Sequence, residues 1–555
     1  MGNTIKIFCT NNNTTQTFNA GTSLLNIYKE MKIELPSQLA SARVNNKAES
    51  LNYVCYNSKT VEFVGINDPS GMRTYVRSLC FVFAKAVEDL YPGHTLSIQH
   101  PLSRGYYCEI DTKHEMTEEE VLKISQRMQE IIDANHPFLT HEDQMPKVIA
   151  LFRSLGLEDK ALLLETSGDL YIKYNSLDGF IDDYYGALLP YTEMIYLFGL
   201  HKYNKGFLLR VPNPNQPNQL QPYVKQEKMQ AVFRDLLQYQ KTMKMTNAGS
   251  LNKAIEKGRI SIIVKVAEAM QEKSISKIAD EIYSRYAEGV RVVLIAGPSS
   301  SGKTTFCRRL QIQLIANTLD PAIISLDDYY VNRVETPLDE NGEYDYESLY
   351  AIDLELFNSD LNKILAGEKV ALPTYDFPSG KRVFKGNSIQ LKENSIIVME
   401  GIHAMNPDLI PSVNPASVYK IYVSALTSIS LDNHNWISTT DNRLLRRIVR
   451  DYQFRGYSAT DTISRWPLVR KGEDKWIFPY QENADAMVNS AMLYEFAALR
   501  RIAEPILKDV PQTIPEYSEA HRLQKFLRFF NYIDTEQLPN TSLLREFLGG
   551  SSFED

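Results

Sequence analysis

The sequence contains few cysteines, and they are not grouped. Five cysteines are spread over 555 residues, and none belongs to a Cys-x-x-Cys pair. Disulfide frameworks and structural zinc sites need cysteines at short, regular spacings. We therefore expect free thiols in a reducing compartment, and a cytoplasmic protein rather than a disulfide-stabilised secreted one.

Long apolar runs, internal repeats and excess positive charge are also missing. No uncharged apolar stretch approaches the ~20 residues that a membrane-spanning helix needs, so we expect no membrane partner. The net charge of −8 gives no long-range attraction for nucleic acid and argues against it as a partner. Hydrophobic residues make up 43% and charged residues 23%, as in folded proteins. At this length we expect two to four domains.

The first part of the chain alternates β-type runs with helical patterns. Residues 4–65 hold short β-like runs and one helical stretch, Ser23–Met31, which predicts a small α+β unit. Apolar residues recur at helical spacing over Arg73–Leu90. A second helix is predicted over Thr117–Ala134, because Thr117 and Glu120 form a capping-box pattern.

The middle of the chain changes composition. Residues 210–223 are rich in Pro, Asn and Gln, which predicts an exposed loop or linker. Residues 225–286 have mostly helical patterns and are interpreted as a connector packed on its neighbours. Beyond residue 290 the order of β-rich and helical runs predicts a parallel sheet with helices on both faces. The predicted strands are 291–296, 321–326, 395–400 and 418–424, and the predicted helices are 303–317, 351–366 and 440–455.

A glycine-rich loop follows the first of these strands. Its residues match the P-loop pattern G-x-x-x-x-G-K-[ST] and are Gly297, Pro298, Ser299, Ser300, Ser301, Gly302, Lys303 and Thr304, with Thr305 next. Backbone N–H groups of such a loop surround the phosphates of a nucleotide, Lys303 adds a positive charge, and Thr304 offers a hydroxyl to Mg²⁺. The alternative is a Gly/Ser turn that binds nothing, which the flanking strand and helix patterns disfavour.

Carboxylates end two later strands. Asp327 and Asp328 follow the strand 321–326. Ligands collect at the carboxyl ends of parallel strands, so we expect Asp327 at the tip of a neighbouring strand, where it can deprotonate an attacking hydroxyl. Glu400 ends the strand 395–400 and can hold Mg²⁺ through water. The alternatives are a polar turn at 327–328 and an ordinary strand-terminal acid at Glu400.

Six motifs in this order resemble the uridine kinase and phosphoribulokinase family over roughly residues 290–500. They are GPSSSGKTT, SLDDYY, YDY at 344–346, PTYDF at 373–377, VMEGIHA at 398–404 and RLLRRIVRD at 443–451. The resemblance implies transfer of the γ-phosphate of ATP to the 5′-hydroxyl of a nucleoside, with ATP and Mg²⁺ at the P-loop.

The resemblance also implies roles for acceptor-side residues. Asp327 stands at the position of the catalytic base, and Asp345 at that of a carboxylate that binds the ribose hydroxyls. Tyr375 and Phe377 would pack on the base. After the Y-D-F motif the family usually carries His in a V-S-H-S-R run, whereas this chain has Gly380 there. The base preference therefore stays open.

Arginines on a later helix are expected to close over the site. Arg443, Arg446 and Arg450 fall at i, i+3 and i+7 on one helix face, where a lid would set them against the charge of the transferred phosphoryl group. A solvated basic stripe is the alternative. Residues 464–481 are predicted to extend this lid, with an exposed amphipathic loop as the alternative.

The first half resembles another family. Residues 4–65 resemble the TGS domain of threonyl-tRNA synthetases, and residues 70–200 resemble the editing domain that follows it, through AKAVEDLYPG, Gly105-Tyr106-Tyr107 and GFIDDYYGALLPYT. The editing-site ligand positions are occupied here by Phe81, Lys85, Tyr184 and Leu188. Because these side chains cannot form a zinc site, we expect the editing chemistry to be lost.

The sequence thus predicts a multidomain protein of α+β and α/β units. The expected parts are a TGS-like domain (1–66), an editing-like domain without zinc ligands (67–223), a helical connector (224–289), a P-loop nucleoside kinase domain (290–510) and a C-terminal extension (511–555) whose tail from 535 is peripheral. The alternatives are an RNA-associated or regulatory P-loop protein that binds tRNA, and a kinase of a non-nucleoside alcohol. The oligomeric state, a homo-oligomer included, stays open.

Overall fold

A five-stranded parallel sheet forms the centre of the C-terminal half. The computed structural model describes residues 3–553. The strands, in spatial order, are β18 (Asp320–Ser325), β23 (Ser395–Glu400), β17 (Val292–Ala296), β24 (Val418–Ser424) and β25 (Ala486–Asn489). All neighbours run parallel, as predicted. The sequence had led us to expect the strand before Asp327 next to the strand before the P-loop. The structure corrects this, because β23 lies between β17 and β18.

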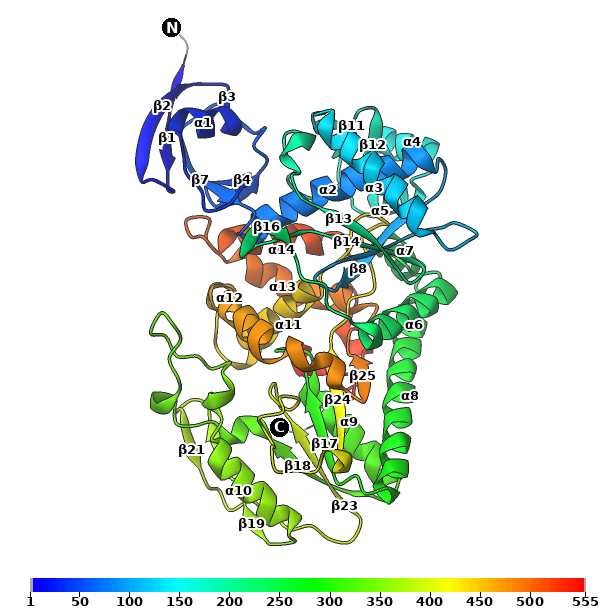
Figure 1. Ribbon diagram of the computed structural model, residues 1–555, viewed down its shortest axis with the longest axis vertical. Helices are drawn as coiled ribbons and strands as arrows, with labels where there is room; N and C mark the ends of the chain where they lie inside the picture. Colours follow the sequence, from blue (N-terminus) through cyan, green and yellow to red (C-terminus); the bar gives the residue numbers. More distant parts are fainter. Residues whose placement is uncertain (1–2, 554–555) are drawn as a thin grey trace.

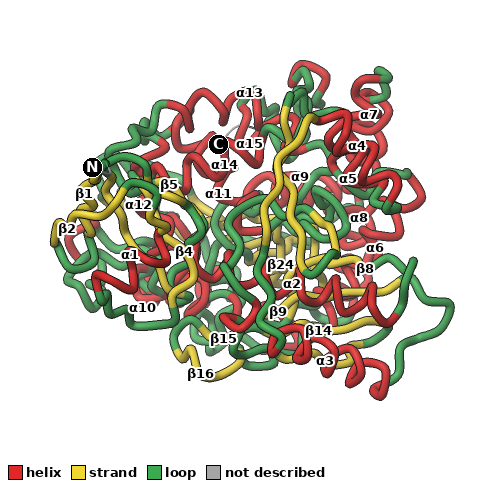
Figure 2. Tube along the Cα trace, turned by 90° about the horizontal axis from the view of Figure 1, so that it is seen from above, coloured by secondary structure: helices red, strands yellow, loops and turns green. Residues whose placement is uncertain are grey.

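Helices cover both faces of this sheet (Figure 1). Val293 and Ile295 of β17 pack into a hydrophobic cluster with α8 and α9, whereas Val292 and Leu294 pack into a second cluster with α10. Since β17 is buried on both faces, it is a continuous apolar run. In the view from above, α8 and α9 lie side by side (Figure 2). The helices are α8 (Ile260–Ala287), α9 (Lys303–Ala316) and α10 (Leu354–Leu365).

The N-terminal half builds sheets of its own. The first is β2-β1-β7-β4-β5, and two others are β13-β14-β9-β8 and β10-β11-β12. The strands are β1 (Thr4–Cys9), β2 (Thr14–Asn19), β4 (Leu39–Val44), β5 (Lys47–Glu49), β7 (Lys59–Gly65), β8 (Leu96–Leu102), β9 (Gly105–Ile110), β10 (Leu139–Gln144), β11 (Tyr171–Leu177), β12 (Phe180–Asp182), β13 (Gly199–Tyr203) and β14 (Gly206–Arg210).

The helices expected in this half are present. α1 (Leu24–Met31) begins after Ser23, whose side chain accepts a hydrogen bond from the backbone N–H of Asn26. α2 (Pro69–Leu90) starts earlier than predicted, with Asp68 as its cap. α3 (Glu118–Asp133) has the predicted reciprocal capping box of Thr117 and Glu120.

The segment between the halves is more ordered than predicted. Residues 210–223 are not a bare linker, because β15 (Pro212–Asn213) pairs with β16 (Gln216–Leu220) in a polar hairpin. Residues 225–286 form helices, as their pattern predicted: α6 (Glu227–Met243), α7 (Ala248–Glu256) and most of α8. α7 packs on α5 (Glu158–Glu165) of the N-terminal half, and α8 packs on α9. Within residues 3–553, no helix combines the length and apolar character needed to cross a bilayer.

The C-terminal tail is not peripheral, which corrects the sequence-based expectation. Leu543 is 1% exposed, and Leu544 and Phe547 are fully buried in the cluster that includes α9. These few apolar residues stand among polar ones, so no periodic pattern predicted their burial. The tail therefore belongs to the core next to the P-loop.

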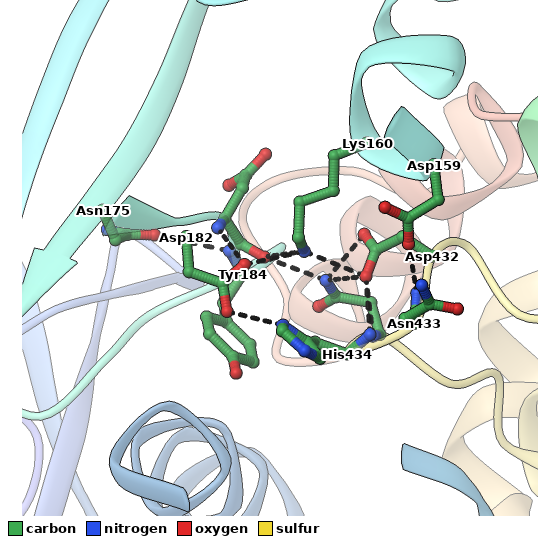
Figure 3. A network of polar contacts seen from close by, with 10 residues as sticks. Asp159, Lys160, Asn175, Asp182, Tyr184, Asp432, Asn433 and His434 are labelled. Atoms are coloured by element: carbon green, nitrogen blue, oxygen red, sulfur yellow. Dashed lines mark hydrogen bonds and ion pairs between the residues drawn. The ribbon is translucent and has the colours of Figure 1, made fainter. Parts of the chain in front are cut away.

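A buried network of charged groups joins the two halves (Figure 3). Lys160 Nζ in α5 lies 2.9 Å from Asp182 Oδ1 and 2.9 Å from Asp432 Oδ1, and all three side chains are fully buried. His434 Nδ1 lies 2.7 Å from Asp182 Oδ2. Asp432 and His434 belong to the loop that follows β24, so the N-terminal half holds this loop in place.

A second ionic chain reaches the helix after that loop. Arg522 in α14 (Tyr517–Leu527) lies 2.7 Å from Asp441 in the first turn of α11 (Thr439–Phe454), and it also pairs with Glu519. Glu519 in turn accepts a hydrogen bond from Arg73 of α2 at 3.0 Å. Figure 1 shows α11 and α14 between the N-terminal half and the sheet. The start of α11 is thus fixed through contacts with both halves.

Candidate active site

The P-loop connects β17 to the N-terminus of α9. Ser300 and Gly302 have left-handed backbones, with φ of 58° and 85°. A Cβ atom on Gly297 would lie 2.0 Å from the carbonyl oxygen of Val423, so only glycine fits there. The hydroxyls of Ser300 and Ser301 are buried and have no hydrogen-bond partner within residues 3–553. A cradle with unsatisfied buried polar atoms fits a phosphate group.

The first turn of α9 carries the other predicted donor-side residues. Lys303 begins the helix, and its Nζ donates to the Pro298 carbonyl at 3.2 Å. Thr304 follows it in the same turn. Thr305 donates from its N–H (3.2 Å) and its Oγ1 (2.8 Å) to Glu546 of the tail. Residues 297–305 thus form one continuous loop and helix start.

Three carboxylates influence one another around Lys303. Burial raises the pKa of Asp327, while the positive charge of Lys303 acts against this rise. Burial and the charge of Asp327 raise the pKa of Glu400 to about 7, although Ser325 Oγ donates to Glu400 Oε1 at 3.2 Å. Burial also raises the pKa of Glu347 to about 7, with Lys303 again opposing. Carboxylates in such surroundings can bind a divalent cation when ionised, and a carboxylate with a raised pKa can accept a proton.

Two acids of one segment differ in their surroundings: Asp345, which the sequence singled out, and Glu347, which it did not. Asp345 Oδ1 accepts the backbone N–H of Glu347 at 3.2 Å, so Asp345 shapes its own turn. Glu347, in contrast, has a buried carboxylate oxygen without a hydrogen-bond partner within residues 3–553. This segment is an irregular run of turns before a short helix, η4 (Leu349–Ala351). No periodic signal therefore distinguished one acid from the other.

Arg443 and Arg446 do not occupy the lid that the helix pattern led us to expect. They are 1% and 0% exposed. Arg443 pairs with Glu473 of α12 (Ala459–Trp476), and Arg446 pairs with Glu495 of α13 (Glu495–Lys508). Both also donate to backbone carbonyls of the P-loop, at 3.2 and 3.4 Å. The i, i+3 spacing of Arg443 and Arg446 therefore marks the buried face of α11. Each guanidinium can be buried there because it has a buried carboxylate partner.

Arg450, the third arginine of the predicted lid, pairs with Asp451 at 2.9 Å, and it acts on the predicted base together with Arg455. The charges of Arg455 and Arg450 counteract the raised pKa of Asp327. Arg447 donates to Ser299 Oγ at 2.9 Å. The predicted lid extension 464–481 is mostly α12, whose Glu473 accepts the backbone N–H of Ser299 at 3.2 Å. The P-loop is therefore held from two helices.

We expect Arg446→Met to lower the free energy of unfolding by about 3–5 kcal/mol, because Glu495 would stay buried without its counter-charge. Chemical denaturation of the full chain measures this. Arg455→Met is the matched control, since the Arg455 side chain is 48% exposed, and its loss should be below about 1 kcal/mol. Unchanged stability of Arg446→Met with lower kcat would favour a lid role instead.

An aromatic group lies on the acceptor side. Tyr375 belongs to the hairpin of β20 (Thr374–Asp376) and β21 (Lys381–Val383), and its N–H donates to Asp328 Oδ1 at 3.1 Å. The rings of Tyr375 and Phe377 meet edge to face, with centroids 5.1 Å apart. Phe377 is 53% exposed. Its open ring face can stack on a flat ligand.

Comparison with known proteins places this site in a family. Residues 292–495 match the model of the Phosphoribulokinase / Uridine kinase family. Over 198 residues the chain is 30% identical to a uridine kinase of Staphylococcus aureus and 29% identical to one of Ureaplasma parvum, covering 36% of this chain and 86% of each relative. A solved structure described as a possible uridine kinase, from Bacillus stearothermophilus, is 25% identical over 24% of this chain and 70% of that chain, with a TM-score of 0.21.

The parallel sheet and the P-loop define a P-loop fold, and the uridine kinase relatives identify it as that of a P-loop phosphotransferase. The chain belongs to the phosphoribulokinase / uridine kinase family. This confirms the resemblance noted for the C-terminal half. The matched residues begin in β17, so they do not include the N-terminal half.

Proposed function

We propose that the protein is an ATP-dependent nucleoside kinase that phosphorylates the 5′-hydroxyl of its acceptor. The arrangement around Lys303 carries this proposal. On one side lies a P-loop whose buried Ser300 and Ser301 hydroxyls have no hydrogen-bond partner among the described residues. On the other lies Asp327, whose neighbour Asp328 accepts a hydrogen bond from the aromatic hairpin. The relatives from Staphylococcus aureus and Ureaplasma parvum are named uridine kinases, which supports a nucleoside as the acceptor.

The donor side is assigned to residues 297–305. Their N–H groups and the Lys303 ammonium bind the phosphates, and Thr304 and Glu400 hold Mg²⁺. Bound ATP with Mg²⁺ supplies the transferable phosphoryl group and the cation that offsets its charge. Arg443 and Arg446 act on the donor indirectly, since they fix the backbone of the P-loop.

The acceptor side is assigned to groups that meet at the carboxyl end of the sheet. Asp327 accepts the proton of the 5′-hydroxyl, and its raised pKa makes it a stronger base than an exposed carboxylate. Glu347, rather than Asp345, is proposed to accept hydrogen bonds from the ribose hydroxyls, because one of its carboxylate oxygens is buried without a partner among the described residues, and the charges of Lys303 and Asp327 act on it. Tyr375 and Phe377 are proposed to pack on the base.

Phe377→Ala is expected to raise the KM for the nucleoside roughly tenfold with little change in kcat, because base stacking on an aromatic ring contributes about 1–3 kcal/mol. Steady-state kinetics with saturating ATP measure this. Phe384→Ala is the control, since Phe384 follows the same hairpin and is 60% exposed. Equal effects of the two substitutions would argue against a specific base-binding role for Phe377.

The direct test of the proposed reaction is an ATP-consumption screen of the full chain. The panel contains all common ribo- and deoxyribonucleosides, together with sugar phosphates and pantothenate-like alcohols. We expect turnover with at least one nucleoside and none with the other alcohols. Turnover only with a non-nucleoside alcohol would keep the phosphotransferase and overturn the nucleoside.

We further propose the division of the chain into 1–66, 67–223, 224–289, 290–510 and 511–555, with the first two parts related to the TGS and editing domains. The separate core formed by residues of the first 63 positions supports the first boundary. Phe81 and Tyr184 are buried and their ring centroids lie 5.1 Å apart. This apolar contact at two of the expected ligand positions supports the loss of a hydrolytic metal centre.

A further inference from the structure

A carboxylate of the C-terminal tail occupies hydrogen-bond donors of the P-loop helix. Glu546 Oε2 accepts from the backbone N–H of Thr305 at 3.2 Å and from its Oγ1 at 2.8 Å. Thr305 lies in the first turn of α9, directly after the G-K-T of the P-loop. In P-loop proteins the N–H groups of this region cradle nucleotide phosphates. Glu546 thus places a negative charge on donors that a phosphate would use.

The position of Glu546 is built into the fold. Glu546 lies in α15 (Arg545–Leu548). Leu543 precedes it in the chain and Phe547 follows it, and both side chains are buried. A Cβ atom on Gly302 would lie 2.5 Å from Leu543, so the tail presses directly on the P-loop. The Phe547 carbonyl accepts from Gln453 of α11 at 2.7 Å. The tail is therefore anchored on both sides of Glu546.

We propose that Glu546 is a built-in competitor of the donor nucleotide, which must displace its carboxylate from Thr305 before the phosphates can bind. This inference rests on the proposed function only in taking the P-loop as the ATP site. The buried apolar anchors allow the tail to stay in place, and rotation of the Glu546 side chain is sufficient to free both donors. The carboxylate of Glu546 therefore lowers the fraction of P-loop sites that hold ATP when the ATP concentration is low.

Charge and hydrogen bonding both support competition rather than assistance. A carboxylate and a polyphosphate repel each other, and both are stabilised by the positive end of the same helix. The charge of Glu546 also reaches Glu400, whose pKa it helps to raise. The two hydrogen bonds to Thr305 place Glu546 at the first turn of the P-loop helix.

The test compares the wild-type full chain with Glu546→Gln, using calorimetric binding of a non-hydrolysable ATP analogue with Mg²⁺ and no acceptor. Glutamine keeps the shape and can still accept from Thr305, so folding should be preserved, and thermal melting checks this. We expect the dissociation constant to fall roughly tenfold, in line with the loss of one charge that competes for a helix N-terminus. Glu546→Ala should act in the same direction.

Glu536→Gln is the matched control, because Glu536 is an exposed acid in the same tail and makes no side-chain contact with the P-loop among the hydrogen bonds and ion pairs of residues 3–553. Its dissociation constant should equal that of the wild type. Equal or weaker binding by Glu546→Gln would overturn the competitor role. Absence of analogue binding by all these proteins would overturn the ATP site of the proposed function and the competitor with it. The nature of the acceptor does not affect either result.

Discussion

Asp327→Asn is expected to reduce kcat by about 10²–10⁴-fold, which is the range for removal of a general base. The amide has the shape of the carboxylate but cannot accept the proton of the acceptor hydroxyl. ATP binding should stay within a few fold of wild type, because the side chain of Asp327, in η2 (Leu326–Tyr329), makes no hydrogen bond or ion pair with residues 297–305 in the described part of the chain, and its proposed role concerns the acceptor. Coupled-assay kinetics and analogue binding, measured on the same preparation, separate the two effects.

Asp328→Asn is the control for this substitution. Asp328 is the adjacent acid, but its Oδ1 accepts the N–H of Tyr375 at 3.1 Å. An amide oxygen can keep that hydrogen bond, so we expect a modest rise in the acceptor KM and a kcat close to wild type. A kcat of Asp327→Asn within about threefold of wild type would show that another group accepts the proton.

Lys160→Met is expected to lower the free energy of unfolding by about 3–5 kcal/mol, which is the usual cost of breaking a buried ion pair by removing one partner. Asp182 and Asp432 would both remain buried after the loss of the ammonium. Figure 3 shows that these carboxylates come from different halves of the chain and meet at Lys160. Denaturant titration of the full chain measures the loss.

Lys147→Met provides the comparison for Lys160→Met. Lys147 in α4 (Met145–Ser154) is 65% exposed and pairs with Asp143 at 3.2 Å. Exposed pairs of this kind contribute about 0–1 kcal/mol, so its removal should be nearly neutral. If both substitutions cost the same small amount, the network in Figure 3 does not stabilise the contact between the halves.

Local signals predicted much of the fold. A continuous apolar run followed by G-x-x-x-x-G-K-T identified β17 and α9, and Thr117 with Glu120 identified the start of α3. These features depend on residues that lie within a few positions of one another, so the sequence contains them directly. The parallel sheet with helices on both faces followed from the order of such elements.

Features that depend on distant residues were not predictable in this way. The P-loop contact of Glu546 joins residues 241 positions apart, and the pairing of Arg446 with Glu495 joins residues 49 positions apart. A helical spacing can show that Arg443 and Arg446 share a face, but not whether a carboxylate covers that face. For the same reason the sequence could not place β23 between β17 and β18.

Phosphorus NMR of the products formed from ATP and an accepted nucleoside tests the central claim most directly. The account predicts ADP and a nucleoside 5′-monophosphate in equal amounts, and no turnover with the 5′-deoxy analogue of that nucleoside. Release of inorganic phosphate alone, or a phosphate on another hydroxyl of the sugar, would contradict an acceptor 5′-hydroxyl held between Asp327 and the P-loop.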